Sequence, residues 1–132
     1  PDRLRNVNTL KSILSQVSTI RSGSSVGYNR QYVAGSDMTI GTIPIGYADG
    51  FSRKLGNGNW QVSIKGKKAP VIGNICMDMC MIDLAGTGAV EGDEVIIFGD
   101  DPALTDMADK LETIPYEVLS RISERVKRVY FH

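Results

Sequence analysis

Short apolar stretches separated by glycine-containing turns dominate the chain and predict a protein built mainly of β-strands. Residues 60–64 alternate cleanly between apolar and polar positions, and residues 10–20 form a longer run rich in Ile, Val, Ser and Thr. The Asn57-Gly58 pair is a turn signal of the tight-hairpin type. We expect strands at residues 10–20, 38–45, 60–64, 69–75, 76–84, 94–98 and 126–131.

Helical patterns are confined to the C-terminal part of the chain. Residues 104–111 form one candidate helix, with Thr105 as its candidate N-cap. A second helix is expected from Pro115 to about Ser123, because proline is tolerated in a first helical turn. The pattern predicts a mainly β fold: a barrel-like domain, with a sandwich as the alternative, and a small C-terminal helical piece.

The start of the chain indicates part of a longer protein. It begins with Pro1 rather than Met, and residues 1–9 carry no clear strand or helix pattern. A length of 132 residues is enough for one domain with its own core. We therefore expect residues 1–9 to be the tail of a preceding domain and residues 10–132 to form one domain.

Composition narrows the choice of partners. The 15 basic and 15 acidic residues cancel, which gives no reason to propose nucleic acid or an anionic membrane as a partner. No run approaches the roughly 18 consecutive apolar residues of a membrane span. Cys76 and Cys80 lie on one predicted strand, too far apart for a disulfide, and the only histidine, His132, completes no zinc site. Two free thiols predict a reducing compartment, the cytoplasm.

Tyrosines near the ends of predicted elements are the candidates for chemistry. As a base, the phenol of Tyr28, with an ordinary pKa of about 10, would need positive charge or hydrogen-bond donors nearby. Tyr47 lies in Gly46-Tyr47-Ala48-Asp49-Gly50, at a strand end that a ligand can approach closely. Tyr116 lies at a predicted helix N-terminus, where anions such as phosphate are favoured. Each has a structural alternative. Tyr28 could be a half-buried sheet tyrosine whose hydroxyl bonds backbone, the Tyr47 segment could be a turn that simply needs small residues, and Tyr116 could be a partly buried ring in a first helical turn.

The remaining polar candidates point to no reaction by themselves. Arg53 could bind a carboxylate or be a solvated charge. On the predicted strand at residues 76–84, Met77 shares a face with the neighbouring methionines as adaptable core, and Asp78 is expected to bond backbone amides. The chain contains no Ser/His/Asp set, phosphate-binding loop or metal-ligand cluster. The residues alone support a β-rich domain with a rim of tyrosines.

As a set, the motifs resemble the C-terminal domain of bacterial alanine racemases, which are pyridoxal-phosphate enzymes of fold type III. The resemblance runs in order from about Leu10 to the C-terminus. It rests on Val26-Gly27-Tyr28, Gly41-Thr42-Ile43-Pro44-Ile45-Gly46-Tyr47-Ala48-Asp49-Gly50, Val71-Ile72-Gly73-Asn74-Ile75-Cys76-Met77-Asp78 and Glu112-Thr113-Ile114-Pro115-Tyr116-Glu117.

The resemblance implies a function for the full-length protein. That protein would interconvert L- and D-alanine for peptidoglycan synthesis, as a homodimer with an additional N-terminal (β/α)₈ barrel domain. A lysine of that barrel would hold pyridoxal 5′-phosphate, so the present chain alone is expected to be inactive.

The resemblance also implies residue roles. Tyr28 is similar to the catalytic tyrosine, which exchanges the α-proton on one face of alanine in the partner subunit's active site. Tyr47 is similar to a tyrosine that narrows the substrate entrance of that same site, and Met77 to a residue whose backbone amide meets the substrate carboxylate. Tyr116 is similar to the tyrosine that contacts the cofactor phosphate within its own subunit. Residues of the substrate-access corridor are implied at Arg53, Ile114 and Asn74.

Some departures and alternatives remain open. Asn74 stands where the family often has arginine, which puts the charge of the access corridor in question. The family's short N-terminal strand is absent, so an open sheet edge is expected. A related pyridoxal-phosphate decarboxylase, a non-catalytic β-barrel interaction module, and a racemase fused behind a ligase domain are the alternatives.

Overall fold

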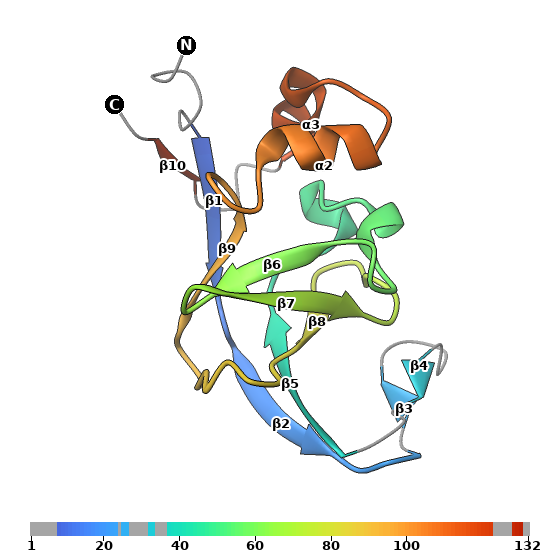
Figure 1. Ribbon diagram of the computed structural model, residues 1–132. Coiled ribbons are helices and arrows are strands. Elements are labelled where there is room, and N and C mark those ends of the chain that lie inside the picture. Colours follow the sequence, from blue (N-terminus) through green and yellow to red (C-terminus); the bar gives the residue numbers. More distant parts are fainter. Residues whose placement is uncertain (1–7, 24, 27–31, 34–36, 123–127, 131–132) are drawn as a thin grey trace.

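The computed structural model describes residues 8–23, 25–26, 32–33, 37–122 and 128–130. It is mostly β, and the α-helices among the described residues lie near the C-terminus (Figure 1). A large sheet has the strand order β10-β1-β9-β6-β7-β8-β5-β2, and β3 and β4 pair separately. The strands are β1 (Asn8–Ile13), β2 (Gln16–Ile20), β3 (Ser25–Val26), β4 (Tyr32–Val33), β5 (Met38–Ile43), β6 (Gln61–Ile64), β7 (Lys67–Ile72), β8 (Cys80–Asp83), β9 (Glu94–Phe98) and β10 (Arg128–Tyr130).

The sheet curls into a barrel-like form because β1 and β2 belong to widely separated positions in the strand order (Figure 1). β1 pairs antiparallel with β9, whereas β2 pairs antiparallel with β5. The chain bends between them at Leu14 and Ser15, whose N–H groups donate to Asp93 O and Thr42 O, both at 2.9 Å. The single strand predicted at residues 10–20 is therefore two strands, and the predicted barrel-like fold is confirmed.

Alternation along the strands fills the interior of the curl. Apolar residues at every second position of β6, β7, β8 and β9 are buried, and Leu14 adds a fully buried side chain at the bend. Full burial of such a side chain contributes about 1.5–3 kcal/mol. Ile40 and Ile72 form a second, smaller cluster.

The segment before β8 differs from the prediction. Residues 76–84 were expected to be one strand, but β8 begins only at Cys80. Backbone hydrogen bonds explain the difference, because Cys76 O and Met77 O accept from Tyr47 N and Ala48 N, both at 2.9 Å. Met77 therefore lies in a bend and is 59% exposed, so the predicted methionine face is wrong at this residue. Asp78, in the same bend, is also exposed.

The tight hairpin turn lies elsewhere than Asn57-Gly58. Lys65 and Gly66, with φ of 51° and 76°, connect the paired strands β6 and β7. Asn57 and Gly58 also have positive φ, but they lead from the 3₁₀ turn η3 (Arg53–Leu55) into β6. The prediction of a turn at this dipeptide is correct, and the prediction of a hairpin is wrong.

The helical piece comprises α2 (Leu104–Lys110) and α3 (Pro115–Arg121), which pack against each other (Figure 1). Pro115 opens α3, as expected. Thr105 lies inside α2, and Ala103 occupies the N-cap position without a side-chain hydrogen bond, so the predicted cap is wrong. Met107, Ala108 and Val118 are buried in the main core. Neither described helix has the length and apolar character needed to cross a membrane.

Candidate functional site

The turn at Gly46-Tyr47 lies directly on the backbone of Cys76 and Met77. Gly46 has extended backbone torsions, which any residue can adopt, so the requirement for glycine here is one of space. A Cβ at this position would come within 2.2 Å of Cys76 O and 2.5 Å of Met77 C. The absence of a side chain therefore allows the two segments to be joined by the hydrogen bonds from Tyr47 N and Ala48 N.

The far end of the same turn contacts the helical piece. Gly50 has a φ of 96°, in the left-handed region that favours glycine, and a Cβ there would lie 2.0 Å from Arg121 O. The 3₁₀ turn η2 (Tyr47–Asp49) thus connects the Met77 bend with the end of α3. Asp49, within η2, is only 1% exposed, and its Oδ2 accepts from Gly46 N at 3.0 Å.

An open hollow of about 710 Å³ lies beside this turn, and we call it the tyrosine hollow. The Arg53 guanidinium stands 4.9 Å from the centre of the Tyr47 ring, in a cation–π arrangement. Among the described residues, no carboxylate forms an ion pair with Arg53. The hollow is lined by Tyr47, Arg53, Asn74, Ile75, Cys76, Met77 and Asp78.

Two further lining residues offer polar groups to the tyrosine hollow. Asn74 Oδ1 accepts a hydrogen bond from Asn57 Nδ2 at 2.9 Å, which leaves the amide group of Asn74 as a possible donor. Within the described part of the chain, the Met77 N–H donates to no other residue. Among the described residues, the tyrosine hollow thus has a backbone donor without an acceptor and a guanidinium without a carboxylate, which is an arrangement suited to a carboxylate ligand.

The sequence-predicted site residues do not all meet here. Tyr47, Arg53, Asn74 and Met77 line the tyrosine hollow. Ile114 and Tyr116 are exposed, by 59% and 73%, near the start of α3, and they are not part of its lining. Tyr28 lies outside the described residues.

The cysteines differ in environment. Burial, with a smaller contribution from Cys76, raises the pKa of the Cys80 thiol far above its usual range, so this thiol stays protonated. Cys76 is only half-buried and borders the hollow. The described residues contain no group of His, Cys, Asp and Glu arranged to hold a metal ion.

Sequence reasoning missed the supporting residues Asn57 and Asp49, which were treated only as turn formers. Their contacts reach Asn74, across seventeen positions of the chain, and Gly46. For Asp49, the signal available in the sequence was a short polar side chain three residues after a strand-ending glycine, a position from which it can bond backbone. Nothing local in the sequence connects Asn57 with Asn74.

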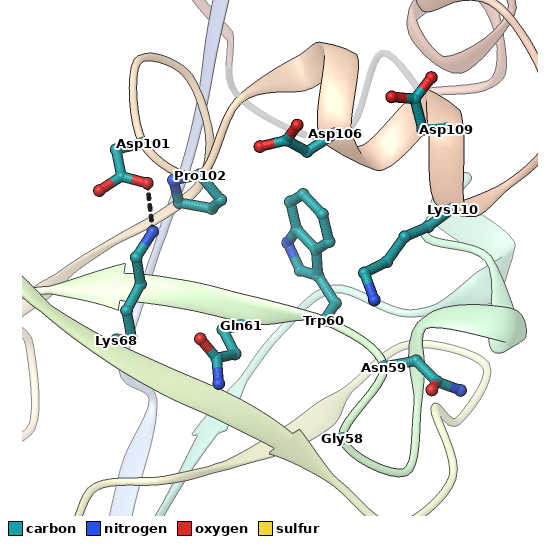
Figure 2. A pocket seen from close by; sticks show the side chains of 10 residues that line it. All are labelled: Gly58, Asn59, Trp60, Gln61, Lys68, Asp101, Pro102, Asp106, Asp109 and Lys110. Carbon is teal, nitrogen blue, oxygen red and sulfur yellow. Dashed lines mark hydrogen bonds and ion pairs between the residues drawn. The ribbon is translucent and has the colours of Figure 1, made fainter.

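A second hollow, of about 440 Å³, lies between the sheet and α2, and we call it the tryptophan hollow (Figure 2). The Lys68 ammonium forms an ion pair with Asp101. The Trp60 ring is buried, and its Nε1 donates to Ile97 O at 2.9 Å. None of the sequence-predicted site residues is among its lining residues, which are Gly58, Asn59, Trp60, Gln61, Lys68, Asp101, Pro102, Asp106, Asp109 and Lys110.

Comparison with known proteins gives a consistent result. Residues 7–130 match the family model described as "Alanine racemase, C-terminal domain". The chain is 44% identical, over 98% of its length, to "Alanine racemase 1" of Caldanaerobacter subterraneus subsp. tengcongensis. It spans 34% of that relative's length, and similarly small shares of the other curated relatives.

Solved structures agree with the family match. The alanine racemase from E. faecalis superposes with a TM-score of 0.82 at 40% identity, over 89% of this chain and 32% of that one. The alanine racemase from Bartonella henselae, solved with covalently bound pyridoxal phosphate, has a TM-score of 0.84 at 33% identity, over 92% of this chain and 34% of that one.

Proposed function

This chain belongs to the family of alanine racemase C-terminal domains, and from that premise we propose that it is part of a pyridoxal-phosphate enzyme that interconverts L- and D-alanine. The observation that carries the proposal is the tyrosine hollow, which Tyr47, Arg53 and Met77 line. Among the described residues, the Met77 N–H donates to no other group and Arg53 has no carboxylate partner. The product D-alanine would serve peptidoglycan synthesis. Pyridoxal phosphate is proposed because the Bartonella henselae relative carries it.

The described residues fit part of such a cofactor site. No lysine lines the tyrosine hollow, so the amine that attaches the cofactor would come from the proposed N-terminal (β/α)₈ barrel domain. Tyr116 is 73% exposed, and its hydroxyl is therefore available to bond the cofactor phosphate within its own subunit. When bound, pyridoxal phosphate delocalises the electron pair left at the α-carbon after proton removal.

The residues of the tyrosine hollow would bind and orient alanine. The Met77 N–H donates to the substrate carboxylate, and the positive charge of Arg53 attracts that carboxylate toward the entrance. The Tyr47 ring narrows the entrance and is stacked with Arg53. Arg53, Asn74 and Ile114 belong to the substrate-access corridor in this proposal.

Tyr28 is the proposed proton-transfer residue. Racemisation requires a proton to leave one face of the α-carbon and another to arrive on the opposite face, so a tyrosine on one face complements a lysine on the other. In the proposed homodimer, Tyr28 and Tyr47 face the partner's site, and Tyr116 serves its own. The proposed location is the cytoplasm, which suits the free thiols Cys76 and Cys80.

Full-length protein loaded with pyridoxal phosphate tests the proposal. We expect racemisation of L- and D-alanine, and we expect Tyr28→Phe to lower the rate about 10²–10⁴-fold. Exchange of the α-hydrogen with D₂O should persist from one enantiomer only, since the lysine face stays intact. Tyr32→Phe, four residues further on, is the matched control and should retain activity.

The assay also separates the alternatives. Release of carbon dioxide from an amino acid without racemisation would indicate the related decarboxylase. Absence of both reactions in the loaded full-length protein would favour the interaction module. Normal racemisation by Tyr28→Phe would remove the role of Tyr28 while leaving the enzyme class intact.

A further inference from the structure

We infer that Asp49 is a positioning residue that holds Tyr47 and Met77 in the geometry required for substrate binding. This inference rests on the proposed function. Asp49 lines neither hollow, so it would act through the backbone of the turn rather than by touching alanine.

Burial shows that the Asp49 carboxylate has a specific structural partner. Its side chain is 1% exposed, and transferring a carboxylate from water is costly unless hydrogen bonds replace those to solvent. Its Oδ2 accepts from Gly46 N at 3.0 Å, while its own backbone N donates to Gly46 O, also at 3.0 Å. The reciprocal pair joins the first and last residues of the turn, which fixes the backbone between them.

The residues between Gly46 and Asp49 make the contacts with the Met77 bend. Tyr47 N donates to Cys76 O, and Ala48 N donates to Met77 O, both at 2.9 Å. The absence of a Gly46 side chain keeps these backbones close. A displacement of Gly46 would therefore move the Tyr47 ring and the Met77 peptide relative to each other.

The Tyr47 ring and the Met77 peptide both have substrate-binding roles in the proposed site. The Tyr47 ring supports Arg53 at 4.9 Å, and the Met77 N–H is the proposed donor to the carboxylate. Misplaced binding groups weaken their interactions with the bound substrate, and this loss appears in KM. Asp49 connects to both groups through one short turn, which makes it the side chain best placed to set their separation.

Asp83 provides a matched control. Its Oδ1 accepts from Ala85 N at 2.9 Å, the same kind of carboxylate-to-backbone bond. Asp83 is more exposed than Asp49 and does not line the tyrosine hollow. Removing it deletes a comparable local bond without disturbing Tyr47 or Met77.

The test uses the full-length enzyme loaded with pyridoxal phosphate, and it measures KM and kcat for alanine. It also measures inhibition by propionate, which has alanine's carboxylate without the amine. We expect Asp49→Ala to raise KM and the propionate inhibition constant about tenfold, with kcat changed about twofold or less, since weaker binding in the ground and transition states appears in KM. Asp49→Asn retains an oxygen acceptor for Gly46 N and should stay within about threefold of wild type. Asp83→Ala should leave both constants unchanged.

The outcomes separate positioning from simple stabilisation. A purely structural role would lower the amount of active enzyme, reducing apparent kcat at constant KM, and that result would overturn the inference. If Asp49→Ala does not fold, Asp49→Glu, which shifts the carboxylate by one methylene, should show the same rise in KM. Unchanged KM in that variant would also overturn it. An inactive wild-type enzyme would overturn the proposed function and this role with it.

Discussion

The tyrosine hollow and the tryptophan hollow lie on the same domain but differ in how their polar groups are used. Around the tyrosine hollow, backbone contacts join the lining segments. Among the described residues, Arg53 has no carboxylate partner and the Met77 N–H donates to no other group. Around the tryptophan hollow, Lys68 is paired with Asp101 (Figure 2). The Trp60 indole Nε1 donates to Ile97 O.

The difference shows that charge alone does not indicate a functional site. The tryptophan hollow has more charged lining residues, including Asp106, Asp109 and Lys110 on the exposed face of α2. Exposed ion pairs contribute little, and a mixed charged surface is normal for a helix. The tyrosine hollow has fewer charged lining residues, but its donor-bearing residues Arg53, Asn74 and Met77 all border the same space. We therefore expect variants in the tryptophan hollow to change stability, and variants in the tyrosine hollow to change substrate binding.

Trp60→Ala should have the largest effect, and it should be an effect on stability. Trp60 is 3% exposed, and truncating a buried Trp costs about 3–5 kcal/mol of unfolding free energy. Urea denaturation of the chain measures the loss. Trp60→Phe keeps most of the ring and should lose less. An increase in KM for alanine in folded full-length Trp60→Phe would contradict a purely stabilising role for the tryptophan hollow.

Gly46→Ala should affect both stability and binding. Its Cβ would overlap Cys76 O, and such overpacking costs about 1–3 kcal/mol. Because Tyr47 and Met77 would separate, we also expect a higher KM in the full-length enzyme. Gly58→Ala in the tryptophan hollow is the control, since its Cβ meets nothing within 4 Å. With a φ of 82°, that variant should cost about 1–2 kcal/mol without changing KM.

Arg53→Ala should have a smaller effect, confined to substrate binding. In the proposed site the exposed charge of Arg53 attracts the substrate carboxylate, and an exposed charge pair contributes about 0.2–1 kcal/mol, so we expect KM to rise by up to about fivefold. Steady-state kinetics of the full-length enzyme measures it. Lys54→Ala removes a neighbouring exposed cation that does not line the hollow, and it should leave KM unchanged. Equal effects of the two variants would indicate general electrostatic attraction instead.

Lys68→Ala should have the smallest effect. Its ion pair with Asp101 is solvent-exposed, with side chains 40% and 77% accessible, so its loss should cost about 0–1 kcal/mol. Denaturation at low and high salt checks this value, because salt should reduce the difference from wild type. A measurable change in KM for alanine would show that the tryptophan hollow takes part in substrate binding.

Strand positions were predictable where local pattern and turn residues agree. The predicted strand at residues 94–98 coincides with β9, which follows a Glu91-Gly92-Asp93 turn. The bend at Leu14 was not predictable, because strand-like residues continue through it and only the partners β9 and β5 divide it. The apolar residues Cys76, Met77 and Met79 have the local pattern of a strand. Backbone hydrogen bonds from the η2 turn to Cys76 and Met77 hold this segment in another conformation.

The candidate site was predictable only as separate pieces. Spacing could indicate that Tyr47 stands at a strand end, but not that Asn74 and Met77 border the same hollow. Their grouping in the prediction came from resemblance to a family. The physical reason is that the contacts of the η2 turn depend on the lack of side chains at Gly46 and Gly50. Their importance is visible only when the neighbouring backbones, at Met77 and Arg121, are in place.

The bend between β1 and β2 also has a consequence for the order in which the domain assembles. β2 can pair with β5 early in synthesis, but β1 must wait for β9 and β10, near the end of the chain. Contacts between such distant segments slow folding, and an unpaired strand edge is prone to non-native association. Pairing of β1 with β9 and β10 is therefore expected to be a late step, after the β6–β7 hairpin and the β2–β5 pair have formed.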